Sequence, residues 1–168
     1  MKYIKLFMKL TLIGILIFSC NSPDRSMGFT NWSPDGKEYK FFLGTDQAVQ
    51  VVKDLDKAWA EKDYDKMREY ISDTAKFYWP NGLINKGVDD IIDVISSNES
   101  PDNAWTFNGA FSVDINPAIG GEHVHASISG NIADSLGVKR DYHEKYYVID
   151  GKVVTWHQWR MNVNPEDE

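Results

Sequence analysis

The chain is poor in cysteine and in basic residues, and both shortages limit what it can be. A single cysteine among 168 residues cannot build a framework of disulfides. With 18 Lys and Arg against 25 Asp and Glu, the formal net charge is −7, which argues against nucleic-acid binding because phosphate contacts need clustered cations. The most apolar segment, Leu10–Phe18, is far shorter than the roughly 20 residues that a membrane-spanning helix needs.

The charges are unevenly distributed along the chain. All charged residues among the first 19 are lysines, Lys2, Lys5 and Lys9, so the remaining residues carry 15 basic and 25 acidic groups, a net charge of −10. A basic start followed by an apolar run is typical of a secretory signal peptide. We therefore assign residues 1–19 to a signal peptide, with a retained anchor as the alternative.

The end of this segment, Ile17-Phe18-Ser19-Cys20, resembles a bacterial lipobox. The resemblance implies that Cys20 becomes the lipidated N-terminus of an exported protein. Lipidation would also account for a lone thiol in an exported chain. The expected location is the bacterial cell envelope, at the outer membrane on its periplasmic or surface side; a simple secreted protein is the alternative.

Residues 20–44 begin as a polar tether, since their Asn, Ser, Pro, Asp and Gly cannot bury enough apolar surface to order the segment. Tyr39–Leu43 is apolar enough to form a short strand. The folded domain is expected over residues 45–164, followed by an acidic tail at 165–168.

The periodicity of the domain changes from helical to extended. Apolar residues at helical spacing predict three helices, which begin after Thr45, Asp63 and Gly87. A short hairpin over 74–86 turns at Pro80-Asn81-Gly82. Four longer strands follow, over Trp105–Ile115, Glu122–Ala133, Val138–Ile149 and Lys152–Val163. Helices that precede a run of antiparallel strands indicate an α+β domain.

Three further segments are informative by their order and spacing: Ala58–Gly82, Asn85–Ile95 and His143–Met161. Together they resemble the nuclear transport factor 2-like superfamily, in its SnoaL-like branch. The resemblance implies a cone-shaped half-barrel in which three N-terminal helices pack on a strongly bent, mostly antiparallel sheet. It also implies a pocket between helices and sheet, and a homodimer formed through the sheet.

The resemblance does not fix a reaction, because this superfamily contains enzymes, binding domains and domains without chemistry. In the related ketosteroid isomerases a general-base carboxylate precedes the proline of the first hairpin, and Trp79 stands there. Their tyrosine on the first helix falls at about Leu55, and their second acid at about His143. That chemistry is therefore not expected, whereas chemistry that pairs a histidine with an acid stays open.

The resemblance also implies which side chains of the last hairpin face the pocket. These are Asp141, His143 and Lys145 on one strand and Trp156, Gln158 and Arg160 on the other. His143 would then be a general acid/base, with Asp141 to orient it and Arg160 to hold an anionic or carbonyl oxygen. The alternatives are a satisfied ion-pair network and a solvated sheet face, and a one-residue bulge would exchange the two faces.

The sequence contains no convincing metal site, and we expect none. His123-Val124-His125 places two imidazoles on one side of a strand, but the spacing that a cupin requires is broken at Pro117 and at Ser129-Gly130. The aromatic residues suggest a ligand instead. Trp59, Tyr78, Trp156 and Gln158 are the candidate ligand-binding residues, and a small apolar or aromatic molecule is the expected partner.

Three functions therefore remain after the sequence is read. The leading one is an envelope-anchored domain that binds a small molecule without a cofactor. The second is a lyase, isomerase or hydratase that uses His143 with Asp141, and the third is a non-catalytic dimerisation or interaction domain. Whether the protein is an enzyme stays open at this point.

The lipobox makes a testable prediction. In cells fed a radioactive fatty acid, the wild-type chain should incorporate label, and a Cys20→Ala variant should lose all of it, because the thiol is the acceptor. The measurement is autoradiography of the purified protein. Label that persists in Cys20→Ala would overturn the assignment.

Overall fold

The computed structural model describes residues 26–30, 36–115 and 120–163. The proposed signal peptide 1–19, Cys20, the loop residue Pro117 and the acidic tail 165–168 lie outside the described residues. Within the described part, no helix is both long enough and apolar enough to cross a membrane.

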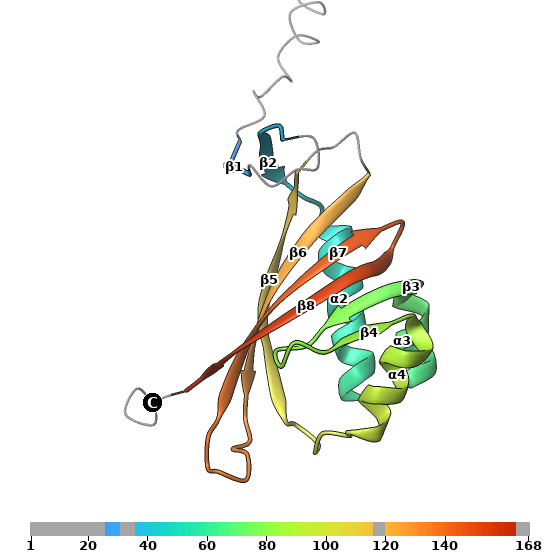
Figure 1. Cartoon of the computed structure of the whole chain (residues 1–168), viewed down its shortest axis with the longest axis vertical. Coiled ribbons are helices and arrows are strands. Elements are labelled where there is room, and N and C mark those ends of the chain that lie inside the picture. Colours follow the sequence, from blue (N-terminus) through green and yellow to red (C-terminus); the bar gives the residue numbers. More distant parts are fainter. Residues whose placement is uncertain (1–25, 31–35, 116–119, 164–168) are drawn as a thin grey trace, which may run out of the picture.

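The described residues form three helices and one eight-stranded sheet (Figure 1). The helices are α2 (Asp46–Ala60), α3 (Tyr64–Tyr70) and α4 (Val88–Ser97). The strands are β1 (Gly28–Thr30), β2 (Tyr39–Leu43), β3 (Ile71–Tyr78), β4 (Ile84–Lys86), β5 (Trp105–Asp114), β6 (Gly121–Gly130), β7 (Arg140–Ile149) and β8 (Lys152–Asn162).

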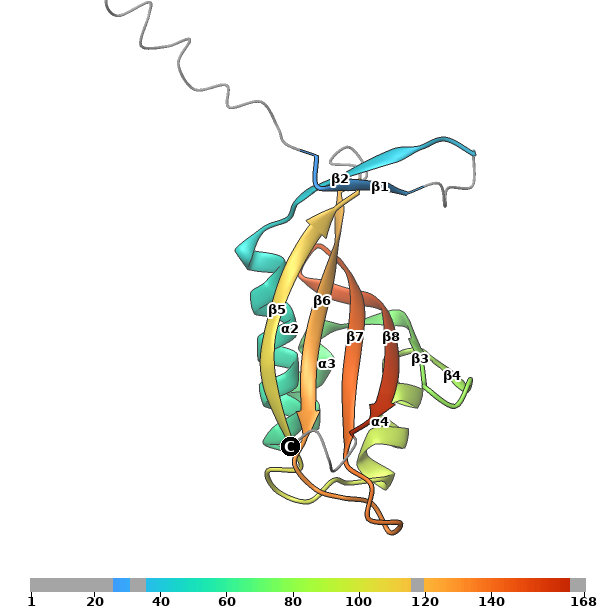
Figure 2. The same cartoon turned by 90° about the vertical axis from the view of Figure 1, so that its left-hand side faces the viewer.

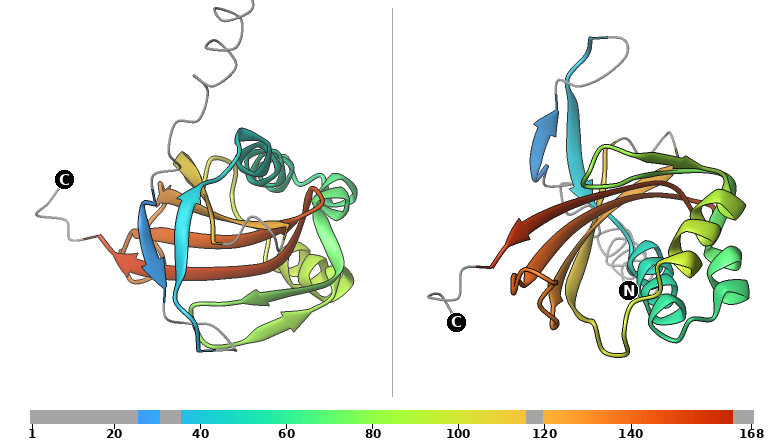
Figure 3. Two further views of the ribbon diagram at one scale, coloured as in Figure 1. Left: turned by 90° about the horizontal axis from the view of Figure 1, so that it is seen from above. Right: turned by 60° about the horizontal axis from the view of Figure 1, so that its bottom comes forward.

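The sheet is mostly antiparallel, in the order β1-β2-β5-β6-β7-β8-β3-β4, and only the β3–β8 pair is parallel. The helices lie on one side of the long strands β5–β8 (Figure 2). Figure 3 shows the sheet curling toward the helices without closing on itself. The predicted α+β class and the strongly bent, mostly antiparallel sheet are confirmed.

The N-terminus of α2 is fastened to the sheet by a shared set of hydrogen bonds. The Thr45 hydroxyl accepts from the backbone N–H of Ala48 at 3.3 Å, as an N-cap does, and donates to Glu122 on β6 at 2.8 Å. Ser112 on β5 donates to the same carboxylate at 2.7 Å. These bonds hold the first turn of the helix at the end of β5 and β6.

The core lies between the helices and the concave face of the sheet. Its largest fully buried side chains are Trp156, Tyr146, Phe77 and Leu55, and Glu144 is buried among them at 1% exposure. Phe77 stacks on Trp156 with ring centroids 4.1 Å apart. A charged residue type at the centre of an aromatic core is expensive unless it is hydrogen-bonded or neutral, so Glu144 needs an explanation.

The last hairpin contains an irregularity that sets the facing of its side chains. Its two-residue turn is Asp150-Gly151, both with positive φ (49° and 74°), which is the geometry that a tight hairpin turn needs. Val148 pairs with Val153, but Tyr147 pairs with Thr155, so Val154 is an extra residue on β8. This β-bulge shifts the pairing by one residue for the rest of the hairpin.

The predicted facing of β7 is therefore wrong. A regular hairpin would place Asp141, His143 and Lys145 beside the concave-facing residues of β8. With the bulge, Glu144 pairs with Gln158 and Tyr146 pairs with Trp156. Because side chains alternate along a strand, Asp141, His143 and Lys145 lie on the opposite, outer face of the sheet.

Candidate functional site

A cavity of about 330 Å³ lies between α2, the end of α4, the segment that follows α4, and the concave face of β6–β8. Its volume is within the range of small-molecule sites. Its aromatic, charged and amide-bearing lining residues include Asp56, Trp59, Trp79, Trp105, Arg140, Tyr142, Glu144 and Gln158. Indole rings thus line the cavity together with a few polar groups.

Glu144 is the polar group at the base of this cavity. Its carboxyl group accepts a hydrogen bond from the Tyr146 hydroxyl and a second from the Gln158 side-chain amide at 2.6 Å. Both partners come from the concave faces of β7 and β8, which the bulge at Val154 brings into register. Glu144 is therefore held in one orientation by its neighbours.

The surroundings of Glu144 change its acidity. Burial and, to a smaller extent, the negative charge of Asp56 raise the pKa of this carboxyl group, the hydrogen bonds from Tyr146 and Gln158 offset part of the rise, and the resulting pKa is about 7. A carboxyl group with a pKa near 7 is present in both protonation states at neutral pH. It can therefore donate or accept a proton under physiological conditions.

Asp56 is a second carboxyl group on the cavity wall. It lies on α2, and its Oδ1 accepts a hydrogen bond from the indole N–H of Trp105 at 2.9 Å. Burial raises the pKa of Asp56, and the hydrogen bond from Trp105 lowers it in part. Asp56 therefore fixes the position of the Trp105 ring across the cavity.

One ion pair stands at the edge of the cavity. Arg140, at the start of β7, pairs with Asp134, and both line the cavity. The same carboxylate of Asp134 accepts hydrogen bonds from the backbone N–H groups of Leu136 at 2.8 Å and Val138 at 3.0 Å. Asp134 thus anchors the loop between β6 and β7 and holds the guanidinium group at the cavity edge.

Three indole rings form part of the apolar wall, beside aliphatic side chains such as Ile95 and Ile128. Trp59 on α2 lies against Trp105, with ring centroids 5.2 Å apart, and Trp79 donates its N–H to Asn85 Oδ1 at 2.6 Å. The N–H groups of Trp79 and Trp105 are thus occupied by protein acceptors. What these two rings offer a ligand is their apolar and π surface.

The structure separates the four predicted ligand-binding residues. Trp59 and Gln158 line the cavity. Trp156 faces the same side but is buried in the core against Phe77 and does not line the cavity. Tyr78 lies elsewhere, because it pairs with His157 and stacks on its ring at 4.1 Å.

The predicted catalytic group is not assembled in the cavity. His143 is exposed on the outer face, and its Nε2 lies 3.1 Å from His125 Nδ1 rather than beside Asp141. Arg160 pairs with Tyr142 near the end of β8, where it is exposed, and does not line the cavity. The prediction that Asp141, His143 and Arg160 meet in the pocket is wrong. The bulge at Val154 is the physical reason why Asp141 and His143 of β7 face away from the pocket.

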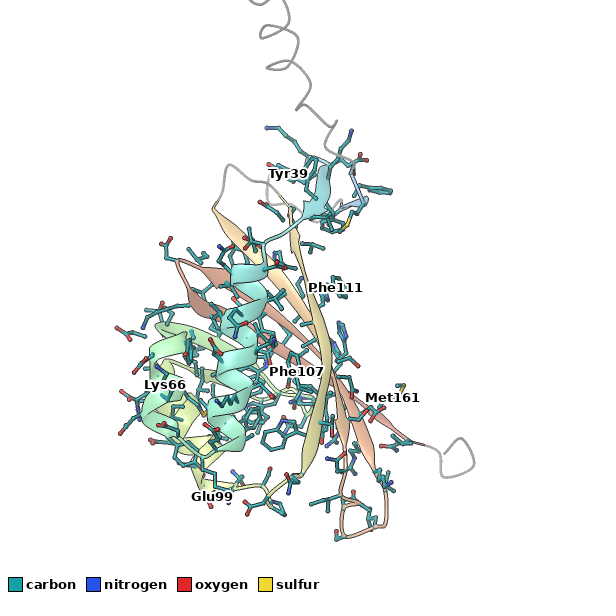
Figure 4. All side chains as sticks on the ribbon, turned by 180° about the vertical axis from the view of Figure 1, so that it is seen from behind. Tyr39, Lys66, Glu99, Phe107, Phe111 and Met161 are labelled. Atoms are coloured by element: carbon teal, nitrogen blue, oxygen red, sulfur yellow. The ribbon has the colours of Figure 1, made fainter. Side chains whose placement is uncertain are left out.

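The outer face of the sheet instead collects all four histidines of the chain. Burial, and to a smaller extent the positive charges of Lys145 and neighbouring imidazoles, lowers the pKa of His123 and of His125 to about 4. Within the described residues, no three or more His, Cys, Asp or Glu side chains are grouped to hold a metal ion. Phe111 and Met161 lie on this face, and Phe107 on the helix side of β5 (Figure 4).

Sequence reasoning missed Asp56, Arg140 and Glu144. Glu144 lies one residue after His143, and it lines the cavity. Asp56 had a readable signal, because it lies four residues after Val52 and three before Trp59, on the same side of the helix as the apolar stripe. Nothing in the sequence marks Arg140 as a cavity residue.

Solved structures share this fold at low sequence identity. A ketosteroid isomerase-like protein from Kribbella flavida matches with a TM-score of 0.54 and 11% identity, covering 73% of this chain and 83% of that one. An LEH-like epoxide hydrolase from M. tuberculosis matches with a TM-score of 0.55 and 14% identity, covering 70% of this chain and 84% of that one. An NTF2-like protein from Burkholderia xenovorans LB400 matches with a TM-score of 0.51 and 16% identity, covering 71% of this chain and 92% of that one. Neither a family model nor a curated protein matches the sequence.

The buried carboxyl group should make stability depend on pH. The fold raises the pKa of Glu144 from 4.5 to about 7, so its contribution to stability is fully present below about pH 4.5 and is lost as pH rises through about 7. Glu144→Gln cannot ionise, so it should be more stable than wild type by about 3 kcal/mol at about pH 8.5. Near pH 4.5 the difference should vanish.

Urea unfolding of both proteins at the two pH values measures this effect. Glu69→Gln, at an exposed position on α3, is the matched control; it retains Glu144, so its stability difference from wild type should be about the same at both pH values. Equal pH dependence in wild type and Glu144→Gln would contradict the raised pKa.

Proposed function

We propose that this chain, which has the nuclear transport factor 2-like fold, binds a small and largely apolar molecule between its helices and its sheet. The observation that carries the proposal is a cavity of about 330 Å³ with three indole rings on its wall and one oriented carboxyl group at its base. Apolar walls with a few convergent polar groups are the usual composition of small-molecule sites. A polar group of the ligand would meet Glu144 and Gln158.

Filling the cavity tests this proposal. A thermal-shift screen of small aromatic alcohols, ketones and amines should yield compounds that raise the Tm of the wild-type protein, since a ligand of the folded state stabilises it. Ala104→Trp places an indole in the cavity and should abolish these shifts. Ser127→Trp adds the same side chain on the exposed outer face and should keep them.

The two variants also show which results would contradict the binding proposal. If the compounds stabilise Ala104→Trp as much as wild type, the ligand binds elsewhere and the proposal is wrong. Loss of the shifts in both variants would point to general damage, which circular dichroism of the unliganded proteins detects independently. A screen without any stabilising compound would also contradict the proposal.

Proton-transfer catalysis is the second candidate function, and the acidity of Glu144 favours it. A carboxyl group with a pKa of about 7, oriented by Tyr146 and Gln158 at the base of a cavity, is suited to move a proton at a bound carbon or oxygen. This replaces the pair His143 and Asp141 as the acid/base group of a lyase, isomerase or hydratase. The expected substrate is a small molecule with an acidic C–H bond beside a carbonyl group.

Exchange of hydrogen for deuterium tests this second function. In D₂O, the carboxylate of Glu144 would take the proton from the α-carbon of bound phenylacetone, and a deuteron from solvent would replace it. The wild-type protein should raise the exchange rate by about 10²-fold or more over buffer, measured by proton NMR. Glu144→Gln should lose the acceleration, whereas His143→Ala should keep it.

The pH profile separates catalysis from binding. The rate should rise as pH increases through about 7, because the ionised carboxylate is the base. Exchange that survives Glu144→Gln but disappears in His143→Ala would overturn the assignment of the base. The two proposals fail separately, since a non-catalytic cavity would still pass the thermal-shift test.

The location and the assembly of the protein stay proposals. Anchoring by lipid at Cys20 concerns a residue outside the described part of the chain. A homodimer through the sheet is supported by exposed apolar side chains on the outer face, where Phe111, Trp159 and Met161 are 58%, 50% and 67% exposed. An exposed apolar patch on a sheet is typical of an interaction surface.

A further inference from the structure

The charges on the cavity wall do not balance. Asp56, Asp134 and Glu144 supply three carboxyl groups, and Arg140 supplies the only guanidinium or ammonium group among the described lining residues. Arg140 is already paired with Asp134 at the cavity edge. Asp56 and Glu144 therefore face the cavity without a cation of the protein to offset them.

The groups that do contact these two carboxyls are neutral. Asp56 accepts from the indole N–H of Trp105, and Glu144 accepts from Tyr146 and from the amide of Gln158. Hydrogen bonds orient a carboxylate, but these neutral donors bring no positive charge to replace the hydration that burial removes. This is why burial raises the pKa of both groups, and why a bound cation would stabilise their ionised forms.

The aromatic wall provides a second, independent contribution. Trp59, Trp79 and Trp105 line the same cavity as the two carboxyl groups. The face of an indole ring attracts a cation more strongly than the other aromatic side chains do, and aromatic cages bind substituted ammonium groups in this way. Asp56 holds the Trp105 ring through its N–H, and Trp105 lies 5.2 Å from Trp59 between ring centroids.

We propose that the molecule bound in this cavity is a cation, a substituted ammonium group on a small aromatic or aliphatic body. The ammonium group lies beside Asp56 and Glu144, and the body contacts the indole rings of Trp59 and Trp105. This inference rests on the proposed function, because it names the ligand class of the same cavity. An anionic ligand is disfavoured, since it would face two carboxyl groups while the charge of Arg140 is already offset by Asp134.

A cationic ligand makes binding depend on pH. The ionisable groups that line the cavity are Asp56 on α2, Tyr142, Glu144 and Arg140 on β7, and Asp134 on the β6–β7 loop; Tyr146 does not line it but donates to Glu144. Of these, the Glu144 carboxyl group loses its proton near pH 7. Cation affinity should therefore rise with pH through about 7, with release of a proton on binding.

Three aromatic probes of similar size distinguish ligand charge from ligand shape. They are 2-phenylethylammonium, neutral 2-phenylethanol and anionic phenylacetate, titrated into the detergent-solubilised full-length protein. Quenching of tryptophan fluorescence and isothermal titration calorimetry give two independent dissociation constants. At about pH 8 the ammonium probe should bind at least about tenfold tighter than the alcohol, and phenylacetate should bind most weakly.

The matched variants assign this preference to the two carboxyl groups. Asp56→Asn and Glu144→Gln keep the size of the side chains and should each reduce the preference for the ammonium probe about threefold or more. Asp93→Asn removes the same charge from an exposed position on α4 and should leave it unchanged. Lowering the pH to about 5.5 should weaken the ammonium probe and leave the alcohol unaffected.

The outcomes separate this inference from the proposed function. If 2-phenylethanol binds as tightly as the ammonium probe at about pH 8, the cavity binds small molecules but the cationic class is wrong. Tightest binding of phenylacetate would also overturn the inference and point to Arg140. If none of the three probes binds at up to about 10 mM, the inference fails, and a positive thermal-shift screen would then still support the cavity.

Discussion

One extra residue in strand β8, Val154, determines which side chains of the last hairpin enter the cavity. Side chains alternate between the faces of a strand, so a shift of one residue exchanges the two faces completely. Beyond the bulge, Glu144 lies opposite Gln158 and Tyr146 opposite Trp156, all on the concave side. The only hydrogen-bonded carboxyl group in the core, among the described residues, follows from this register.

Burial of Glu144 costs stability that the rest of the core must offset. An apolar residue at this place would pack in the core without a desolvation penalty, whereas the carboxyl group needs Tyr146 and Gln158 to satisfy its oxygens. A group that destabilises the fold above pH 7 and also faces a cavity is better explained by a role toward a ligand than by a role in packing. Asp56 repeats the same pattern on the opposite wall, which makes chance placement of Glu144 a weaker explanation.

The sequence predicted the elements well and the site only in part, for a physical reason. Apolar spacing fixes where helices and strands begin and end, so the helix after Thr45, the turn at Asp150-Gly151 and the four long strands appear where the patterns place them. The facing of a strand depends on its register against a partner, and a bulge leaves no local mark in a run such as Val153-Val154-Thr155. The sequence therefore predicted His143 in the cavity, where the structure has the neighbouring Glu144. Trp59 lines the cavity as predicted, because the face of a helix follows from its own periodicity and needs no partner strand.

The two faces of the sheet carry opposite chemistry, and the same register separates them. The concave face presents Glu144 toward Asp56 of α2, and the pKa values of both carboxyl groups are raised, whereas on the outer face burial and positive neighbours lower the pKa values of His123 and His125. At neutral pH His123 and His125 are therefore mostly uncharged, and His125 stacks on Phe111, so it extends the apolar surface that Phe111, Trp159 and Met161 expose. A face of this composition is suited to contact another surface, and the cavity on the other side of the same strands is left to recognise a small molecule.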